Sequence, residues 1–104
     1  MTPERWSSLR FEEQMGHITS EIIRARHWEE ASDRTSRNQA LERVLELVDA
    51  SLDCHHGARC RELTLLREVV SDCFAGTAVY DVGLSDLQQY GMPFAVRARE
   101  KSHS

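Results

Sequence analysis

The sequence contains few of the residues that interrupt helices and little that favours strands. It has two prolines and five glycines among its 104 residues. Pro3 follows a capping Thr2, as at the start of a helix. The only β-prone run, residues 77–83, is short and has no second run to pair with. We therefore expect an all-α protein in which residues 77–83 form a packed connection between helices.

Long apolar runs and concentrated positive charge are also missing. No run approaches the roughly 18 apolar residues that a membrane span requires. The formal net charge is −4, whereas nucleic-acid binding needs a concentrated positive field. The N-terminal stretch is charged from its fourth residue and has no apolar core, unlike a secretory signal. The three cysteines lack a framework spacing, so we expect a cytoplasmic protein with neither a membrane nor a nucleic-acid partner.

Familiar catalytic motifs do not occur in the sequence. It has no G-x-S-x-G turn and no glycine-rich phosphate loop. His17 and Glu21 are the only groups that we consider for acid–base chemistry. We therefore favour a protein without enzymatic activity and without a cofactor.

Three long amphipathic helices are predicted from the spacing of apolar residues. The first runs from residue 2 to about residue 30, and the second, capped by Ser32 or Asp33, runs to about residue 54. The third runs from about residue 58 to residue 75, where Gly76 is placed to end it. The apolar positions are Phe11, Met15, Ile18, Ile22, Ala25, Leu41, Val44, Leu45, Val48, Leu52, Leu63, Leu66, Val69, Val70, Cys73 and Phe74.

A short fourth helix is predicted after residue 83. Residues 85–88 match a capping box, whereas Gly91 and Pro93 are expected to break or kink the helix. The short link before the third helix forces the second and third helices into an antiparallel hairpin. The sequence thus predicts one domain, residues 1–104, with residues 101–104 as a frayed tail. Its fold class is an all-α antiparallel bundle of three long helices and a short broken fourth helix.

The runs QMGHITSEIIRARHW, RNQALERVLELVD and RELTLLREVVSDCFAG follow one another in the chain. In this order they resemble small bacterial all-helical proteins of unknown function. The resemblance covers most of the chain, contains no catalytic motif and implies no activity.

The back of the first predicted helix carries a second, partly apolar face. Leu9, Gly16, Ser20 and Ile23 lie on this face, with Trp6 at its edge. Small residues let another backbone approach closely, and the fourth helix has too few large apolar residues to cover the whole face. We interpret the face as the interface of a homodimer, so the leading prediction is a non-catalytic interaction or assembly module. The alternative for Gly16 and Ser20 is that they are ordinary surface residues.

Polar residues follow the edges of the apolar seams. Six of them are candidates for an inter-helix polar pocket that binds a small ligand: Gln14, His17, Glu21, Arg24, Arg37 and Glu62. Such a ligand-binding or metal-binding bundle is the alternative function. For the six residues themselves, we favour a network of ion pairs whose stems pack while the charged heads stay in water.

Potential metal ligands gather in the link between the second and third helices. Cys54, His56 and Cys60 are residue types that zinc accepts, and His55 lies among them. The set lacks a C-x-x-C pair and a second ligand pair. We therefore favour a solvated turn and expect no stoichiometric zinc.

Overall fold

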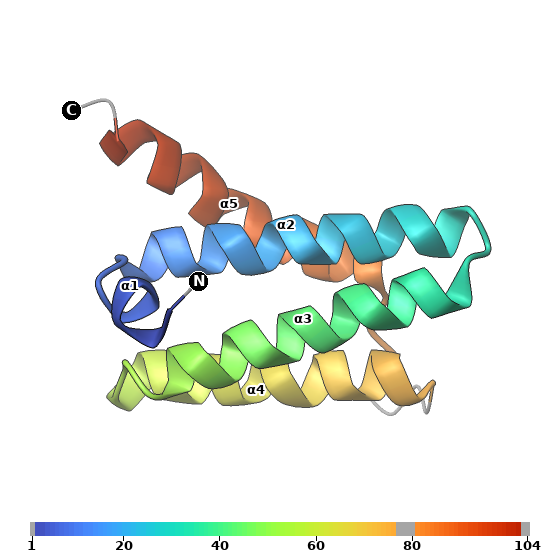
Figure 1. Ribbon diagram of the computed structural model, residues 1–104, viewed down its shortest axis with the longest axis horizontal. Coiled ribbons are helices and arrows are strands. Elements are labelled where there is room, and N and C mark those ends of the chain that lie inside the picture. Colours follow the sequence, from blue (N-terminus) through green and yellow to red (C-terminus); the bar gives the residue numbers. More distant parts are fainter. Residues whose placement is uncertain (1, 77–80, 103–104) are drawn as a thin grey trace.

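The computed structural model describes residues 2–76 and 81–102, and all regular structure in them is helical. Five helices follow one another: α1 (Pro3–Ser7), α2 (Phe11–Glu30), α3 (Arg34–Leu52), α4 (Gly57–Ala75) and α5 (Leu84–Ser102). Figure 1 shows the chain reversing direction from α2 to α3 and again from α3 to α4. The prediction of an all-α protein is confirmed. Residues 77–80 of the predicted connection lie outside the described residues.

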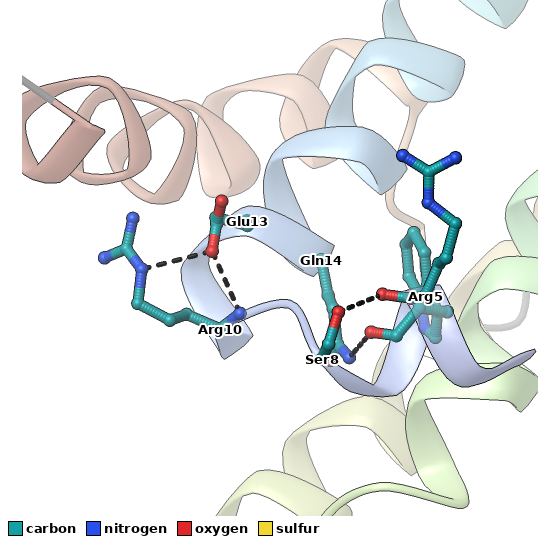
Figure 2. Close-up of polar contacts among 6 residues, drawn as sticks. Arg5, Ser8, Arg10, Glu13 and Gln14 are labelled. Atoms are coloured by element: carbon teal, nitrogen blue, oxygen red, sulfur yellow. Dashed lines mark hydrogen bonds and ion pairs between the residues drawn. The ribbon is translucent and has the colours of Figure 1, made fainter.

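The prediction of one continuous first helix is wrong, because the chain forms α1 and α2 instead. Thr2 caps α1 and accepts the N–H of Arg5 at 3.2 Å. The hydroxyl of Ser8 donates to the carbonyl of Arg5 at 2.7 Å, and such local bonds compete with a continuing helix (Figure 2). α2 then starts after Arg10, whose N–H donates to Glu13 Oε1 at 3.0 Å.

Burial of Trp6 explains this break. The side chain is 3 % exposed, and its Nε1–H donates to Ser51 Oγ of α3 at 3.1 Å. The amide of Gln14 donates to the Trp6 carbonyl at 2.9 Å and holds α1 across the start of α2 (Figure 2). A continuous helix would carry Trp6 to the back of α2, away from α3.

The ends of α3 and α4 follow their predicted caps. Asp33 Oδ1 accepts the N–H of Ser36 at 3.0 Å at the start of α3. Gly76 ends α4 with a φ of 72°, a left-handed conformation that residues with a Cβ rarely adopt.

The prediction of a short, broken fourth helix is also wrong. α5 has 19 residues, the same length as α3 and α4, and continues through Gly91 and Pro93. The N–H of Gly83 donates to Asp86 Oδ2 at 3.0 Å, so the helix begins before the predicted capping Ser85. Residues 101–102 of the predicted tail are helical, and residues 103–104 lie outside the described residues.

Contact with α2 explains why Gly91 is tolerated in α5. Figure 1 shows α5 crossing behind α2. A Cβ added to Gly91 would stand 2.1 Å from Thr19 Oγ1, so only glycine permits this approach. The burial gained against α2 offsets the roughly 1 kcal/mol that glycine costs within a helix.

The core lies along α2, α3 and α4. Its largest fully buried apolar side chains are Met15, Ile18, Ile22, Leu41, Val44, Val48, Leu63 and Val70, and all of them belong to the predicted seams. Four other seam positions differ, since Leu45, Leu52 and Cys73 are half-buried and Phe74 is exposed at the end of α4. α2 packs against α3 and α5, and α4 packs against α3, whereas the backbones of α4 and α5 lie farther apart. We call the α4–α5 side the open side of the bundle for this reason.

Candidate functional site

The structure does not bring the six residues of the predicted polar pocket together. Gln14 is buried beside α1, where its Oε1 lies 2.6 Å from His55 Nε2. The ring of His17 lies near the ring of Trp6, with centroids 5.7 Å apart and planes tilted by 51°. Glu62 of α4 accepts a hydrogen bond from Tyr90 of α5.

Glu21 and Arg24 belong to an ion-pair group on the surface. Glu21 Oε1 lies 3.1 Å from Arg24 Nη1, and Glu21 Oε2 lies 3.1 Å from Arg43 Nε. The two arginine side chains are about half exposed, so solvent screens both pairs. These contacts are the ion pairs that we favoured over a ligand pocket.

Arg37 links three helices at the other end of the bundle. Its Nη2 donates to the Cys73 carbonyl at 2.9 Å, and its Nη1 donates to Asn38 Oδ1 at 3.0 Å. Glu29 Oε2 lies 3.7 Å from its Nε. These residues border a polar recess of about 480 Å³, but the guanidinium is already held by its three partners. Arg37 therefore ties α2 and α4 to α3.

The candidate zinc ligands do not form a cluster. Cys54 Sγ donates to the Ala50 carbonyl of α3 at 3.3 Å, and His56 is exposed before α4. Within residues 2–76 and 81–102, no three side chains of His, Cys, Asp or Glu stand close enough to hold a metal ion. Cys73, predicted to face the core, is half-buried and donates to the Val82 carbonyl at 3.2 Å. Burial raises the pKa of the Cys73 thiol, so it stays protonated.

A polar network near α1 was not predicted from the sequence. It joins Trp6, Gln14, Ser51 and His55 through hydrogen bonds between α1, α2, α3 and the α3–α4 link. Because the Gln14 amide donates to the Trp6 carbonyl, its Oε1 accepts from the His55 Nε2–H. Burial first, and then the positive charges of Arg59 and His56, lower the pKa of His55, which favours its neutral form. Gln14 was predicted to lie in a line of polar residues, but nothing in the sequence indicated its hydrogen-bond partners.

The predicted dimer face of α2 is partly covered by α5 of the same chain. A Cβ added to Gly16 would lie 3.7 Å from the Cα of Ala95. Ser20 is exposed and donates to the Gly16 carbonyl of its own helix at 3.1 Å, while Leu9 is half-buried. The close backbone approach predicted for Gly16 therefore occurs within the chain. Ile23, 39 % exposed, is the large apolar residue that this face leaves to solvent.

An apolar groove of about 560 Å³ lies between α4 and α5 on the open side of the bundle. The groove is lined by Arg61, Glu62, Leu65, Leu66, Val69, Val82, Asp86, Leu87 and Tyr90. Leu65 is 55 % exposed, more than any other large apolar residue that the structure describes. Leu65 was not predicted as a functional residue, because it lies off the apolar face of α4. The one indication in the sequence was that a leucine stands among the polar residues of this helix.

A single side-chain hydrogen bond spans this groove from helix to helix among the described residues. The hydroxyl of Tyr90 in α5 donates to Glu62 Oε1 in α4. Burial and the Glu62 carboxylate raise the pKa of Tyr90, so the phenol keeps its proton near neutral pH. The contact fixes one end of the groove and leaves the apolar part open.

Comparison of the chain with protein-family models, with curated proteins and with solved structures gives no match. The resemblance to small bacterial helical proteins therefore stays a prediction. None of the described helices combines the length and the apolar character that crossing a membrane requires.

Proposed function

We propose that the protein is a non-catalytic assembly module, an antiparallel helical bundle that forms a homodimer through the groove between α4 and α5. The observation that carries the proposal is the apolar groove with the exposed Leu65 on its wall. An uncovered apolar groove of this kind commonly marks an interface. As part of the same proposal we place the module in the cytoplasm, where its three free cysteines stay reduced.

A second copy of the chain is the occupant that suits this groove best. Leu65 is exposed on the wall of an apolar groove. The same surface therefore offers both an apolar side chain and a groove of the size to receive one. In a two-fold dimer the same patch meets itself. If the two-fold axis of the dimer runs along the groove, the α4 wall of one copy lies over the α5 wall of the other. Arg61 then meets the wall that carries the partner's Asp86, an attraction between opposite charges.

The contacts of the two acid–base candidates support a module without catalysis. Glu21 is shared between Arg24 and Arg43, and His17 lies against Trp6. Neither side chain lines the groove.

Sedimentation equilibrium tests the proposal with two matched variants. Leu65→Asp places a charge at the centre of the proposed interface, whereas Ile23→Asp places one on the α2 face predicted from the sequence. We expect a wild-type dimer at micromolar concentration, a monomeric Leu65→Asp variant and a dimeric Ile23→Asp variant. A wild-type protein that stays monomeric at high micromolar concentration refutes self-association. A dimer lost only in Ile23→Asp refutes the groove and assigns the interface to the α2 face.

A further inference from the structure

Two arginines beyond the Tyr90 end of the groove are fixed over aromatic rings. The guanidinium carbon of Arg59 lies 5.0 Å from the ring centroid of Phe11, and that of Arg97 lies 5.3 Å from the ring centroid of Phe94. The two rings are in contact, with centroids 5.6 Å apart and planes at 88°. Stacking of this kind orients a guanidinium and restricts its motion before any ligand binds.

The two guanidinium groups lie on the same side of the bundle. Arg59 lies one helical turn from Glu62 on α4, and Arg97 lies two turns from Tyr90 on α5. The hydrogen bond between Tyr90 and Glu62 shows that these faces of α4 and α5 look toward each other. Arg59 and Arg97 therefore converge on the aromatic pair from the two helices.

No described carboxylate pairs with either Arg59 or Arg97. The nearby Glu13 holds Arg10 at 3.1 Å, and Glu62 is bonded to Tyr90. The first turn of α4, which contains Arg59, has no acidic residue. The lowered pKa of His55, caused after burial by the charge of Arg59, agrees with a positive local potential.

We infer that Arg59 and Arg97 form a binding site for a small oxyanion, a phosphate or carboxylate group, at the aromatic pair of Phe11 and Phe94. Guanidinium groups donate paired N–H bonds that match both kinds of oxyanion. The site lies outside the groove lining and does not depend on the proposed dimer.

Amide NMR titrations with inorganic phosphate, and separately with succinate, at pH 7.5 and constant ionic strength test the site. We expect saturable shifts at residues 56–60 and 94–98. Stronger binding of phosphate assigns a phosphorylated ligand, and stronger binding of succinate assigns a carboxylate ligand. The Arg59→Gln/Arg97→Gln variant should bind at least about tenfold more weakly, the loss expected when charged hydrogen bonds are removed.

An Arg5→Gln/Arg34→Gln variant is the matched control, because it removes the same charge from two exposed arginines other than those placed over Phe11 and Phe94. It should bind like the wild type. An Arg59→Lys/Arg97→Lys variant keeps the charge and loses the planar donors, so its affinity should fall between wild type and the glutamine variant. If the glutamine variant loses its native spectrum, the lysine variant decides. Absence of saturable shifts, or equal weakening in the control, overturns the inference.

Discussion

The two flanks of α5 differ in how they meet their neighbours. Toward α2, the helix presents Gly91 and Ala95, which lie against Thr19 and Gly16 with almost no space between the helices. Toward α4, it presents Leu87 and Tyr90, and the space between the helices stays open as a groove.

The difference shows that side-chain size decides which flank closes. Small residues on α2 and α5 allow the two backbones to approach, and dispersion contacts then fill the interface. α4 packs against α3, and its backbone stays farther from α5 than the backbone of α2 does. The hydrogen bond from Tyr90 to Glu62 joins the two helices on the α4 flank. The α2 flank is thus closed by small residues, whereas the α4 flank keeps an apolar groove.

The largest effect is expected when a core side chain and a groove side chain are each truncated to alanine. Ile18→Ala removes a fully buried side chain of α2 and should lower the free energy of unfolding by about 2–5 kcal/mol. Leu65→Ala removes an exposed side chain of the groove and should cost at most ~0.5 kcal/mol. Urea unfolding of dilute protein, followed by circular dichroism, gives both values. Equal losses from the two variants would mean that the groove is as well filled as the core.

Alanine at the two glycines of the α2–α5 contact tests the closed flank itself. Gly91→Ala forces a Cβ to within 2.1 Å of Thr19 Oγ1 and should destabilise the fold by about 1–3 kcal/mol through overpacking. Gly16→Ala meets only an ordinary contact at 3.7 Å from Ala95 and should stabilise the helix by up to ~1 kcal/mol.

Thermal unfolding of the two alanine variants, with Thr19→Ala/Gly91→Ala as a rescue variant, measures these effects. The double variant should recover part of the loss, because the hydroxyl and methyl that clash are gone. A stabilising Gly91→Ala change would show that α5 does not approach α2 this closely.

Protonation of His55 should produce the smallest effect. The pKa of His55 is lower in the folded protein than in the unfolded chain, so the unfolded chain binds the proton more readily. This contribution to stability is complete above the unfolded pKa of about 6.5 and is lost as the pH falls through the folded pKa. Urea midpoints measured from pH 7.5 to about pH 5 should fall, and a His55→Gln variant should fall less. An identical pH dependence in both proteins would contradict the role of His55.

Much of the helical content was predictable because it depends on local spacing. The buried residues of α2, α3 and α4 occur at helical periods, and Asp33 and Gly76 are residue types that cap helix ends. The break before α2 was not predictable in this way, because it depends on a bond from Trp6 to the distant Ser51. The arginines over Phe11 and Phe94 were not predicted for the same reason. The stacking on Phe11 and the contact between the two rings join different helices, so they form only when the helices assemble.

The sequence by itself determined that this chain is helical, about where α3 and α4 begin and end, and most of the buried positions of α2, α3 and α4, because these properties follow from local propensity and periodicity. Only the tertiary structure decided that α5 is one continuous helix and that it packs against α2. Local rules predicted a break at Gly91 and Pro93, but contact with Thr19 favoured a continuous helix. That contact also placed α5 on the small residues of α2, the face that had suggested a dimer, and left the α4 side open. A helix can bury only part of its surface against one neighbour, and which part it buries is settled by the fit between side chains far apart in the sequence.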